Sequence, residues 1–284
     1  VMGRSFKNIS RLFTIARILA RHDALMLLEK LEIGGPAVIL ARIFSRKGHG
    51  RPGQRLAAAL QEAGPSFIKF GQALSTRSDL LGEEFSSDLS QLQDSLAPFP
   101  AQLVHATIKS EFSKNVDEIF DKFDDVPVAA ASIAQVHFAV TKEGREVAVK
   151  ILRPNIEDAF QRDIDLFLWI ASLVEAAKPE YRRLRPVEAI QTLAESIKLE
   201  MDLRFEAAAA AELGLNMENI EGFNVPSIYW KLTGQRVLTT ERVHGIPIDD
   251  ITALRAAGHD TNKLLEKSAN AFFMQVFRDG FFHA

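Results

Sequence analysis

Apolar residues recur at helical spacing through most of the first 112 residues. In the first predicted helix, the apolar residues that share one stripe are Ile9, Leu12, Phe13, Ala16, Leu19 and Ala20. The same spacing predicts four more helices in this part of the chain: 54–63, one that starts at Pro65, 83–95 and 101–112. Pro98 and Pro100 separate the last two helices, because proline interrupts helical hydrogen bonding.

The pattern changes after Pro127. Two β-rich runs, joined by a five-residue turn, predict a hairpin over 136–140 and 146–152. Two long helices, two short strands and a final helix are predicted to follow, in the order 157–177, 186–213, 227–230, 236–240 and 261–278. Gly214 and Gly280 are expected to stop the second and the last of these helices. Helices around a small antiparallel sheet predict an α+β fold.

Composition places the chain among ordinary globular proteins, with 284 residues, 47% of them hydrophobic and 25% charged. The sequence contains no cysteine, which excludes disulfides, thiolate zinc sites and cysteine nucleophiles. The best candidate for a membrane span, Leu166–Val174, is shorter than the roughly 18 residues that cross a bilayer.

Charge is unevenly distributed, although the net charge is only −3. Residues 1–50 hold nine Lys and Arg against three Asp and Glu, so they carry +6 and the remaining residues carry −9. A basic segment on an acidic body predicts an anionic partner surface, and membrane headgroups fit better than nucleic acid because the body would repel phosphates. The first helix fits two interpretations: a helix in the membrane interface, or a helix packed on its own domain with its arginines in water.

One lysine stands at an unusual place in the predicted hairpin. Three small apolar residues precede it in the run Val147–Lys150, the pattern of the kinase strand lysine that neutralises nucleotide phosphates. Alone, the pattern also fits a lysine at a strand end with its amine in water. One strand earlier, residues 129–137 form a loop of small residues without glycine, where a kinase has a glycine-rich loop.

Acidic residues gather on the helix predicted over 186–213. Asp202 and Glu206 are four residues apart, so they are expected to share one face and to attract a cation. Glu200 is expected to pair with Arg204 by the same spacing.

Two glycine motifs precede the hairpin. The G-x-G-x-x-G at 48–53 lies outside any strand–helix unit, so we interpret it as a linker. Gly71 lies inside a helix between Lys69 and Gln72, and a helical glycine is costly enough to predict close contact with another element.

Four motifs in this order resemble those of the UbiB family, the ADCK-type atypical kinase-like proteins of ubiquinone biosynthesis. They are Lys69-Phe70-Gly71-Gln72 (K-x-G-Q), the alanine loop 129–137, Val147–Lys150, and Glu200-Met201-Asp202 (E-x-D) continuing to Glu206. The resemblance covers about residues 50–284. It implies a kinase-like fold and divides the chain into four regions. These are a basic helical region 1–50, a helical extension 51–126 with K-x-G-Q, the kinase-like N-lobe and hinge 127–245, and the start of a C-lobe 246–284.

The resemblance also implies that the protein binds ATP or ADP with Mg²⁺. The residues expected at the nucleotide are Val128, Ala129, Ala130, Ala131, Ser132, Ile133, Ala134, Gln135, Val136, Lys150, Glu241 and Val243. Within this set, Ser132 and Gln135 are expected near the phosphates, and the hinge around Glu241 and Val243 is expected to hold adenine.

The resemblance further implies ion pairs around the nucleotide. Lys150 is expected to pair with the helix acid Glu206. Lys69 and Gln72 are expected on a helix over the substrate entrance, with Lys69 meeting an acid of the E-x-D motif, Glu200 or Asp202.

The family's catalytic aspartate is expected just after Ala284, and its metal-binding residues further on. No catalytic or metal-binding residue is therefore assigned to this chain, which is expected to be inactive by itself. His283 is expected to orient the catalytic loop, and His137 to be structural.

The implied function is an atypical kinase or ATPase that supports ubiquinone synthesis and acts on ubiquinone-pathway lipids or proteins. Its expected location is the cytoplasmic side of the bacterial inner membrane, with peripheral attachment in this chain. The alternative is a non-catalytic lipid-binding or scaffolding module on a kinase-like fold.

Overall fold

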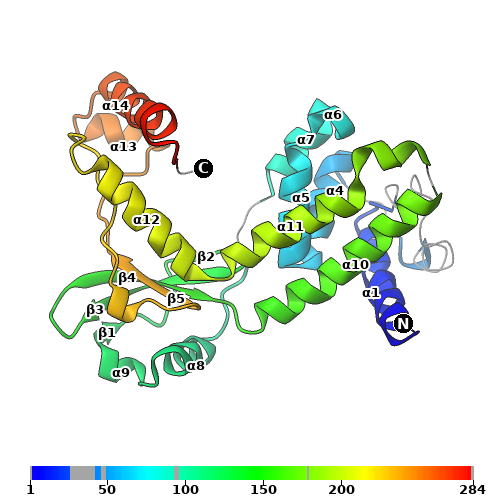
Figure 1. Ribbon diagram of the computed structural model, residues 1–284, viewed down its shortest axis with the longest axis horizontal. Helices are drawn as coiled ribbons and strands as arrows, with labels where there is room; N and C mark the ends of the chain where they lie inside the picture. The colour runs from blue at the N-terminus through cyan, green and yellow to red at the C-terminus, as the bar shows by residue number, and fades with distance from the viewer. Residues whose placement is uncertain (1, 26–41, 46–48, 93–95, 178, 283–284) are drawn as a thin grey trace. The chain divides into compact units, whose positions relative to one another are not determined.

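The computed structural model describes residues 2–25, 42–45, 49–92, 96–177 and 179–282 (Figure 1). The chain forms two compact units that interleave along the sequence. The helical unit comprises Val1–Ala97, Ala130–Ile133 and Arg153–Lys198, and the sheet unit comprises Pro98–Ala129, Ala134–Leu152 and Leu199–Ala284.

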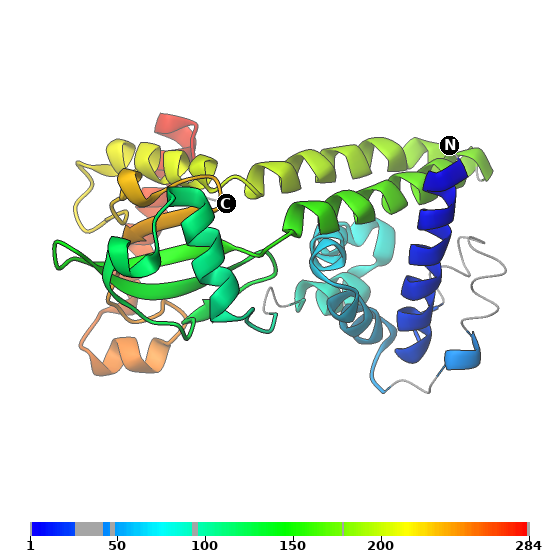
Figure 2. The same ribbon diagram turned by 90° about the horizontal axis from the view of Figure 1, so that it is seen from below.

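Packed α-helices form the helical unit. They are α1 (Met2–Arg21), α4 (Pro52–Ala63), α5 (Pro65–Ser75), α6 (Ser78–Leu81), α7 (Glu83–Ser90), α10 (Ile156–Ala177) and α11 (Pro186–Glu200). α4, α5 and α7 pack on one another, and the long helix α10 contacts both α1 and α5 (Figure 2). Pro52 and Pro65 occupy the first positions of α4 and α5, where a missing backbone N–H costs no hydrogen bond.

The apolar side of α1 is buried within its own unit. All apolar residues from Leu12 to Ala20 are buried except Phe13, which is partly buried. Ile15 and Ile18 lie outside the predicted stripe, yet both are buried, so the buried side of the helix is wider than the sequence indicated. This packing agrees with the second interpretation of the helix, because the apolar residues from Leu12 to Ala20 are covered by the unit itself, although Ile9 of the stripe is 51% exposed.

Basic residues of α1 are bound to acids of the same unit. Arg11 donates two hydrogen bonds to Asp163 of α10, at 2.7 and 3.0 Å, and only 3% of the Asp163 side chain is exposed. Arg21 pairs with Glu62 of α4. Part of the positive charge of residues 1–50 is therefore neutralised by ion pairs within the protein.

The sheet unit is built on a five-stranded sheet. Its strands are β1 (Phe120–Phe123), β2 (Ala129–Ala130), β3 (Ala134–Thr141), β4 (Glu146–Leu152) and β5 (Val237–Glu241). β1, β3, β4 and β5 pair in that order and antiparallel, while β2 pairs with β3. The predicted hairpin is present as β3 and β4, with Ala134 opposite Leu152 and Val140 opposite Glu146.

Helices cover the two faces of this sheet differently. The helices of the unit are α8 (Ala101–Phe112), α9 (Val116–Ile119), α12 (Leu203–Met217), α13 (Ile251–Ala256) and α14 (Thr261–Phe273). Val104 and Ile108 of α8 form a buried cluster with alternate residues of β4, including Val149 and Ile151. Successive side chains of a strand point to opposite faces, so Lys150 projects from the face that α8 does not cover. Figure 1 shows α8 and α12 on opposite sides of the sheet.

The prediction of one helix over 186–213 is wrong. The chain forms two helices, α11 and α12, and Asp202 between them caps α12 by accepting a hydrogen bond from the backbone N–H of Arg204. α12 continues past Gly214 to Met217. Apolar spacing runs across the break, so periodicity alone did not reveal the capping aspartate.

Three smaller differences concern the ends of elements. The helix predicted over 83–95 ends at Ser90 as α7. The strand predicted over 227–230 is a single bridge between Ile228 and Thr240. The final helix is α-helical to Phe273 and continues as a π turn before Gly280, whose φ of +61° suits glycine.

Among the described residues, no helix is both long and apolar enough to cross a membrane.

Candidate functional site

An ion pair joins β4 and α12 on the face of the sheet opposite α8. The ammonium group of Lys150 donates to both carboxylate oxygens of Glu206, at 2.8 and 2.7 Å. Glu206 lies in the first turn of α12, and the two side chains are 30% and 49% exposed. The expected pairing of Lys150 with Glu206 is thus present in the structure. An ion pair this exposed contributes only about 0–1 kcal/mol to the stability of the fold. Because it is exposed, the lysine side chain stays accessible to a ligand.

The break at Asp202 changes the predicted pattern of acids. Asp202 precedes α12, so it does not share a helix face with Glu206 as predicted. Arg204 binds Asp202 through two side-chain hydrogen bonds, at 2.9 and 2.6 Å, while its predicted pair with Glu200 stays a prediction. These hydrogen bonds hold the pKa of Asp202 below its ordinary value.

Arginine 153 holds the alanine loop. Its guanidinium donates to the carbonyl oxygen of Ala131 at 3.2 and 2.9 Å and to that of Ala97 at 3.0 Å. Its backbone N–H donates to the carbonyl of Ile133 at 2.8 Å. Sequence reasoning missed this residue, although its place three positions after Lys150, directly after the same strand, was a usable signal.

The side chains of Ser132 and Gln135 do not face solvent. Ser132 is 0% exposed, and its hydroxyl oxygen has no hydrogen-bond partner among the residues that the structure describes. Gln135 is 1% exposed. In this structure the expected approach of these two side chains to phosphates is not available, so contacts from this loop would come from its backbone.

A buried polar network accounts for the orientation of Gln135. Its side-chain oxygen accepts from the backbone N–H of Phe99 at 3.0 Å, and its side-chain nitrogen lies 2.9 Å from Nε2 of His137. Nδ1 of His137 lies 2.7 Å from the carbonyl oxygen of Asp124. If Nδ1 donates to this carbonyl, Nε2 accepts a hydrogen bond from Gln135. The His137 ring is then a neutral imidazole. Burial lowers the pKa of His137 and so favours this form. The structural role expected for His137 agrees with these contacts.

The expected hinge begins at Glu241, the last residue of β5, and continues beyond the strand. The backbone N–H of Glu241 donates to Ser227, and that of Arg242 donates to Glu146. Val243 has left the sheet and is 65% exposed. Its backbone is therefore better placed than that of Arg242 to meet a ligand.

The K-x-G-Q motif lies on α5 of the helical unit, where Lys69 and Gln72 are partly exposed. A Cβ on Gly71 would lie 2.4 Å from Leu92, just after α7, and 2.7 Å from Leu60 of α4, so the predicted close contact is with neighbouring segments of the same unit. The pairing of Lys69 with Glu200 or Asp202, which belong to the sheet unit, stays a prediction. His283 lies outside the described residues.

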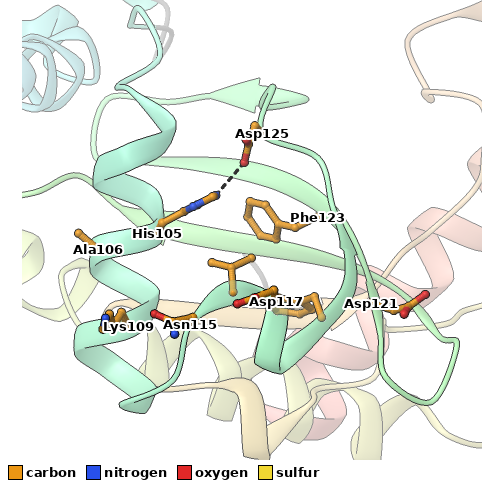
Figure 3. Close-up of a pocket in the computed structure, with 10 residues that line it drawn as sticks. His105, Ala106, Lys109, Asn115, Asp117, Asp121, Phe123 and Asp125 are labelled. Atoms are coloured by element: carbon orange, nitrogen blue, oxygen red, sulfur yellow. Dashed lines mark hydrogen bonds and ion pairs between the residues drawn. The ribbon is translucent and has the colours of Figure 1, made fainter.

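A surface pocket of about 390 Å³ lies elsewhere in the sheet unit, beside α8, α9 and β1 (Figure 3). His105 and Asp125 both line it and are joined directly at 2.7 Å, with Phe123 next to them. None of the residues expected at the nucleotide lines this pocket. In the part of the chain that the structure describes, no group of three or more His, Asp or Glu side chains is arranged to hold a metal ion.

Comparisons with known proteins agree with the motifs. The sequence profile of the ABC1 atypical kinase-like domain matches residues 91–284. The chain is 42% identical over 282 residues to the probable protein kinase UbiB of Marinobacter nauticus, covering 98% of this chain and 51% of that protein. It is 45% identical over 232 residues to the corresponding Xylella fastidiosa protein, covering 82% and 42%.

The chain thus spans about half the length of the curated relatives it matches. A solved complex of Rv3197 with erythromycin, from Mycobacterium tuberculosis, aligns with a TM-score of 0.49 at 28% identity, over 79% of this chain and 54% of that one.

Proposed function

Because this chain belongs to the ABC1 atypical kinase-like family, we propose that the whole protein binds ATP or ADP with Mg²⁺ and acts as an atypical kinase or ATPase in support of ubiquinone synthesis. The relatives named probable protein kinase UbiB support this assignment. The protein substrate or lipid on which the activity acts would be a component of that pathway.

The observation that carries the proposal is the ion pair between Lys150 and Glu206. Two residues that are 56 positions apart meet on the sheet face that α8 leaves uncovered. Kinases use a strand lysine and a helix glutamate in this way to hold nucleotide phosphates. The ammonium remains partly exposed, so it can contact an anion while Glu206 fixes its position.

The residues of this chain fit parts of a nucleotide site. Lys150 would bind phosphate oxygens, backbone groups of residues 129–134 would lie over the phosphates, and backbone groups around Val243 would hold the base. When bound, the Mg-nucleotide supplies the phosphoryl group and a metal that neutralises its charge. The Mg²⁺ ligands are not assigned to residues of this chain.

A thermal-stability measurement on the full-length protein tests nucleotide binding. Mg-ADP at about a hundred times its Kd is expected to stabilise the wild type by about 2.7 kcal/mol. In Lys150→Ala the stabilisation at the same Mg-ADP concentration should largely disappear, because the phosphates lose their main cationic contact. Lys142→Ala, at an exposed lysine in the turn between β3 and β4, is the matched control and should keep the full stabilisation. Equal stabilisation of wild type and Lys150→Ala would contradict the site.

We also propose that the whole protein acts at the cytoplasmic face of a membrane with anionic lipids. The support is the excess of basic residues in the first fifty positions. The apolar side of α1 does not support membrane binding, because it is mostly buried. A purely lipid-binding or scaffolding role therefore has less support than nucleotide binding.

A further inference from the structure

The alanine loop is held by an arginine rather than by its own sequence. Two side-chain nitrogens of Arg153 donate to the carbonyl oxygen of Ala131. The backbone N–H of Arg153 donates to the carbonyl oxygen of Ile133, two residues further along the loop. The same guanidinium binds Ala97. These partners all belong to the helical unit, so the loop and its support form one packed region.

The contact fixes the direction of a backbone N–H group. In a trans peptide the carbonyl and the N–H point in opposite directions. Since the carbonyl of Ala131 points to Arg153, the N–H of Ser132 in the same peptide points away from it. A loop without glycine has few alternative conformations, so this direction is set when the loop folds.

The guanidinium keeps its charge where it is half-buried. Burial lowers the pKa of Arg153, but an arginine still holds its proton throughout the physiological range. Hydrogen bonds from a charged donor to a carbonyl are stronger than neutral ones. The loop is thus fixed by a contact that is stronger than an ordinary turn hydrogen bond.

We propose that Arg153 is the positioning residue of the alanine loop: by binding the carbonyl of Ala131, it orients the loop backbone for nucleotide phosphates and so sets the affinity for them. The inference rests on the proposed function, in which this loop lies over the phosphates. Arg153 itself does not contact the nucleotide in this proposal.

The test compares Arg153→Met with wild type in the full-length protein by two measurements. The first is amide hydrogen exchange of residues 129–133 without nucleotide, which is expected to become about tenfold faster as the charge-assisted hydrogen bonds are lost. The second is titration with Mg-ADP and with adenosine. The Kd for Mg-ADP should rise about tenfold and that for adenosine should stay within about twofold, because only the phosphates meet the loop. Arg162→Met, at an exposed arginine on α10, is the matched control and should change neither measurement.

Faster exchange with an unchanged Kd for Mg-ADP would overturn the proposal, and so would unchanged exchange. Equal losses for Mg-ADP and adenosine would also overturn it, since they would indicate general damage. If Arg153→Met does not fold, Arg153→Lys retains the charge without the fork that spans Ala131 and Ala97, and intermediate values of both measurements are expected. Wild-type values for Arg153→Lys would overturn the role of the fork. Absence of Mg-ADP binding by the wild type would instead refute the proposed function, while the exchange measurement would still report on the loop.

Discussion

Single buried polar groups in the sheet unit decide where side chains of the motifs point. Gln135 belongs to the alanine-loop motif, yet its amide is bound by Phe99 and His137. The backbone groups of Phe99 stand immediately before the helix start at Pro100 and Ala101, so Gln135 connects β3 to α8. A residue that the family resemblance assigns to the nucleotide therefore also serves the packing of the lobe.

His137 makes the stability of the protein depend on pH. Its folded pKa lies below the ordinary value of 6.5, mainly because burial disfavours the charged ring. The neutral ring therefore contributes stability above about pH 6.5, and that contribution is lost as the pH falls towards the folded pKa. Urea unfolding from about pH 7.5 to about pH 5 should show a falling free energy of unfolding.

His137→Asn removes this titration. It should cost about 1–3 kcal/mol at neutral pH, because buried partners lose their hydrogen bonds, and its free energy of unfolding should fall less steeply in acid. The same pH dependence in wild type and His137→Asn would show that other groups cause it.

Helix packing in the helical unit explains the glycine of the K-x-G-Q motif. α5 runs against α4 and α7, and the leucines on either side of Gly71 leave no room for a methyl group. Phe70 stacks on Phe167 of α10 with ring centroids 4.9 Å apart. The middle of the motif thus holds α5 in place, while Lys69 and Gln72 flank it.

A pair of glycine variants separates packing from helix propensity. Gly214→Ala in α12 should stabilise the protein by up to about 1 kcal/mol, because alanine favours helix and its Cβ would meet Val225 at an ordinary 3.7 Å. Gly71→Ala should instead destabilise it by about 1 kcal/mol, because overpacking costs about 1–3 kcal/mol and outweighs the same gain in propensity. Calorimetric unfolding measures both. A stabilised Gly71→Ala would mean that Leu60 and Leu92 move aside freely.

For the whole molecule, charge suggests a weak attraction to anionic membranes. The net charge of −3 hides the basic first fifty residues, but Arg11 and Arg21 are already bound to acids of the protein. Arg17 remains exposed on α1. Attraction through such exposed charges is screened by salt.

Binding to vesicles that contain anionic lipid should weaken as the ionic strength rises, and it should survive Lys150→Ala. Arg17→Glu should weaken it about fivefold or more, since a basic residue near an anionic surface contributes about 1 kcal/mol. Arg145→Glu, at an exposed arginine in the turn between β3 and β4, is the control for net charge. Equal losses in the two variants, or binding that ignores salt, would contradict attraction through α1.

The sequence by itself determined the features that depend on near neighbours. The hairpin of β3 and β4, the place of Lys150 on its strand, and helices such as α8 and α10 follow from the spacing of apolar residues, because strand and helix periods are local properties. The family motifs also came from the sequence, and the profile match over residues 91–284 agrees with them.

Only the tertiary structure decided which distant groups meet. The family resemblance predicted the pair of Lys150 with Glu206, but not that Asp202 starts a new helix before Glu206, because that break is a capping event that apolar spacing does not record. Gln135 turns inward because Phe99 and His137 offer it buried hydrogen bonds, and Arg153 holds a carbonyl 22 positions earlier in the chain. Each of the two compact units combines separate stretches of the chain. These contacts therefore depend on packing between segments that are far apart in the sequence.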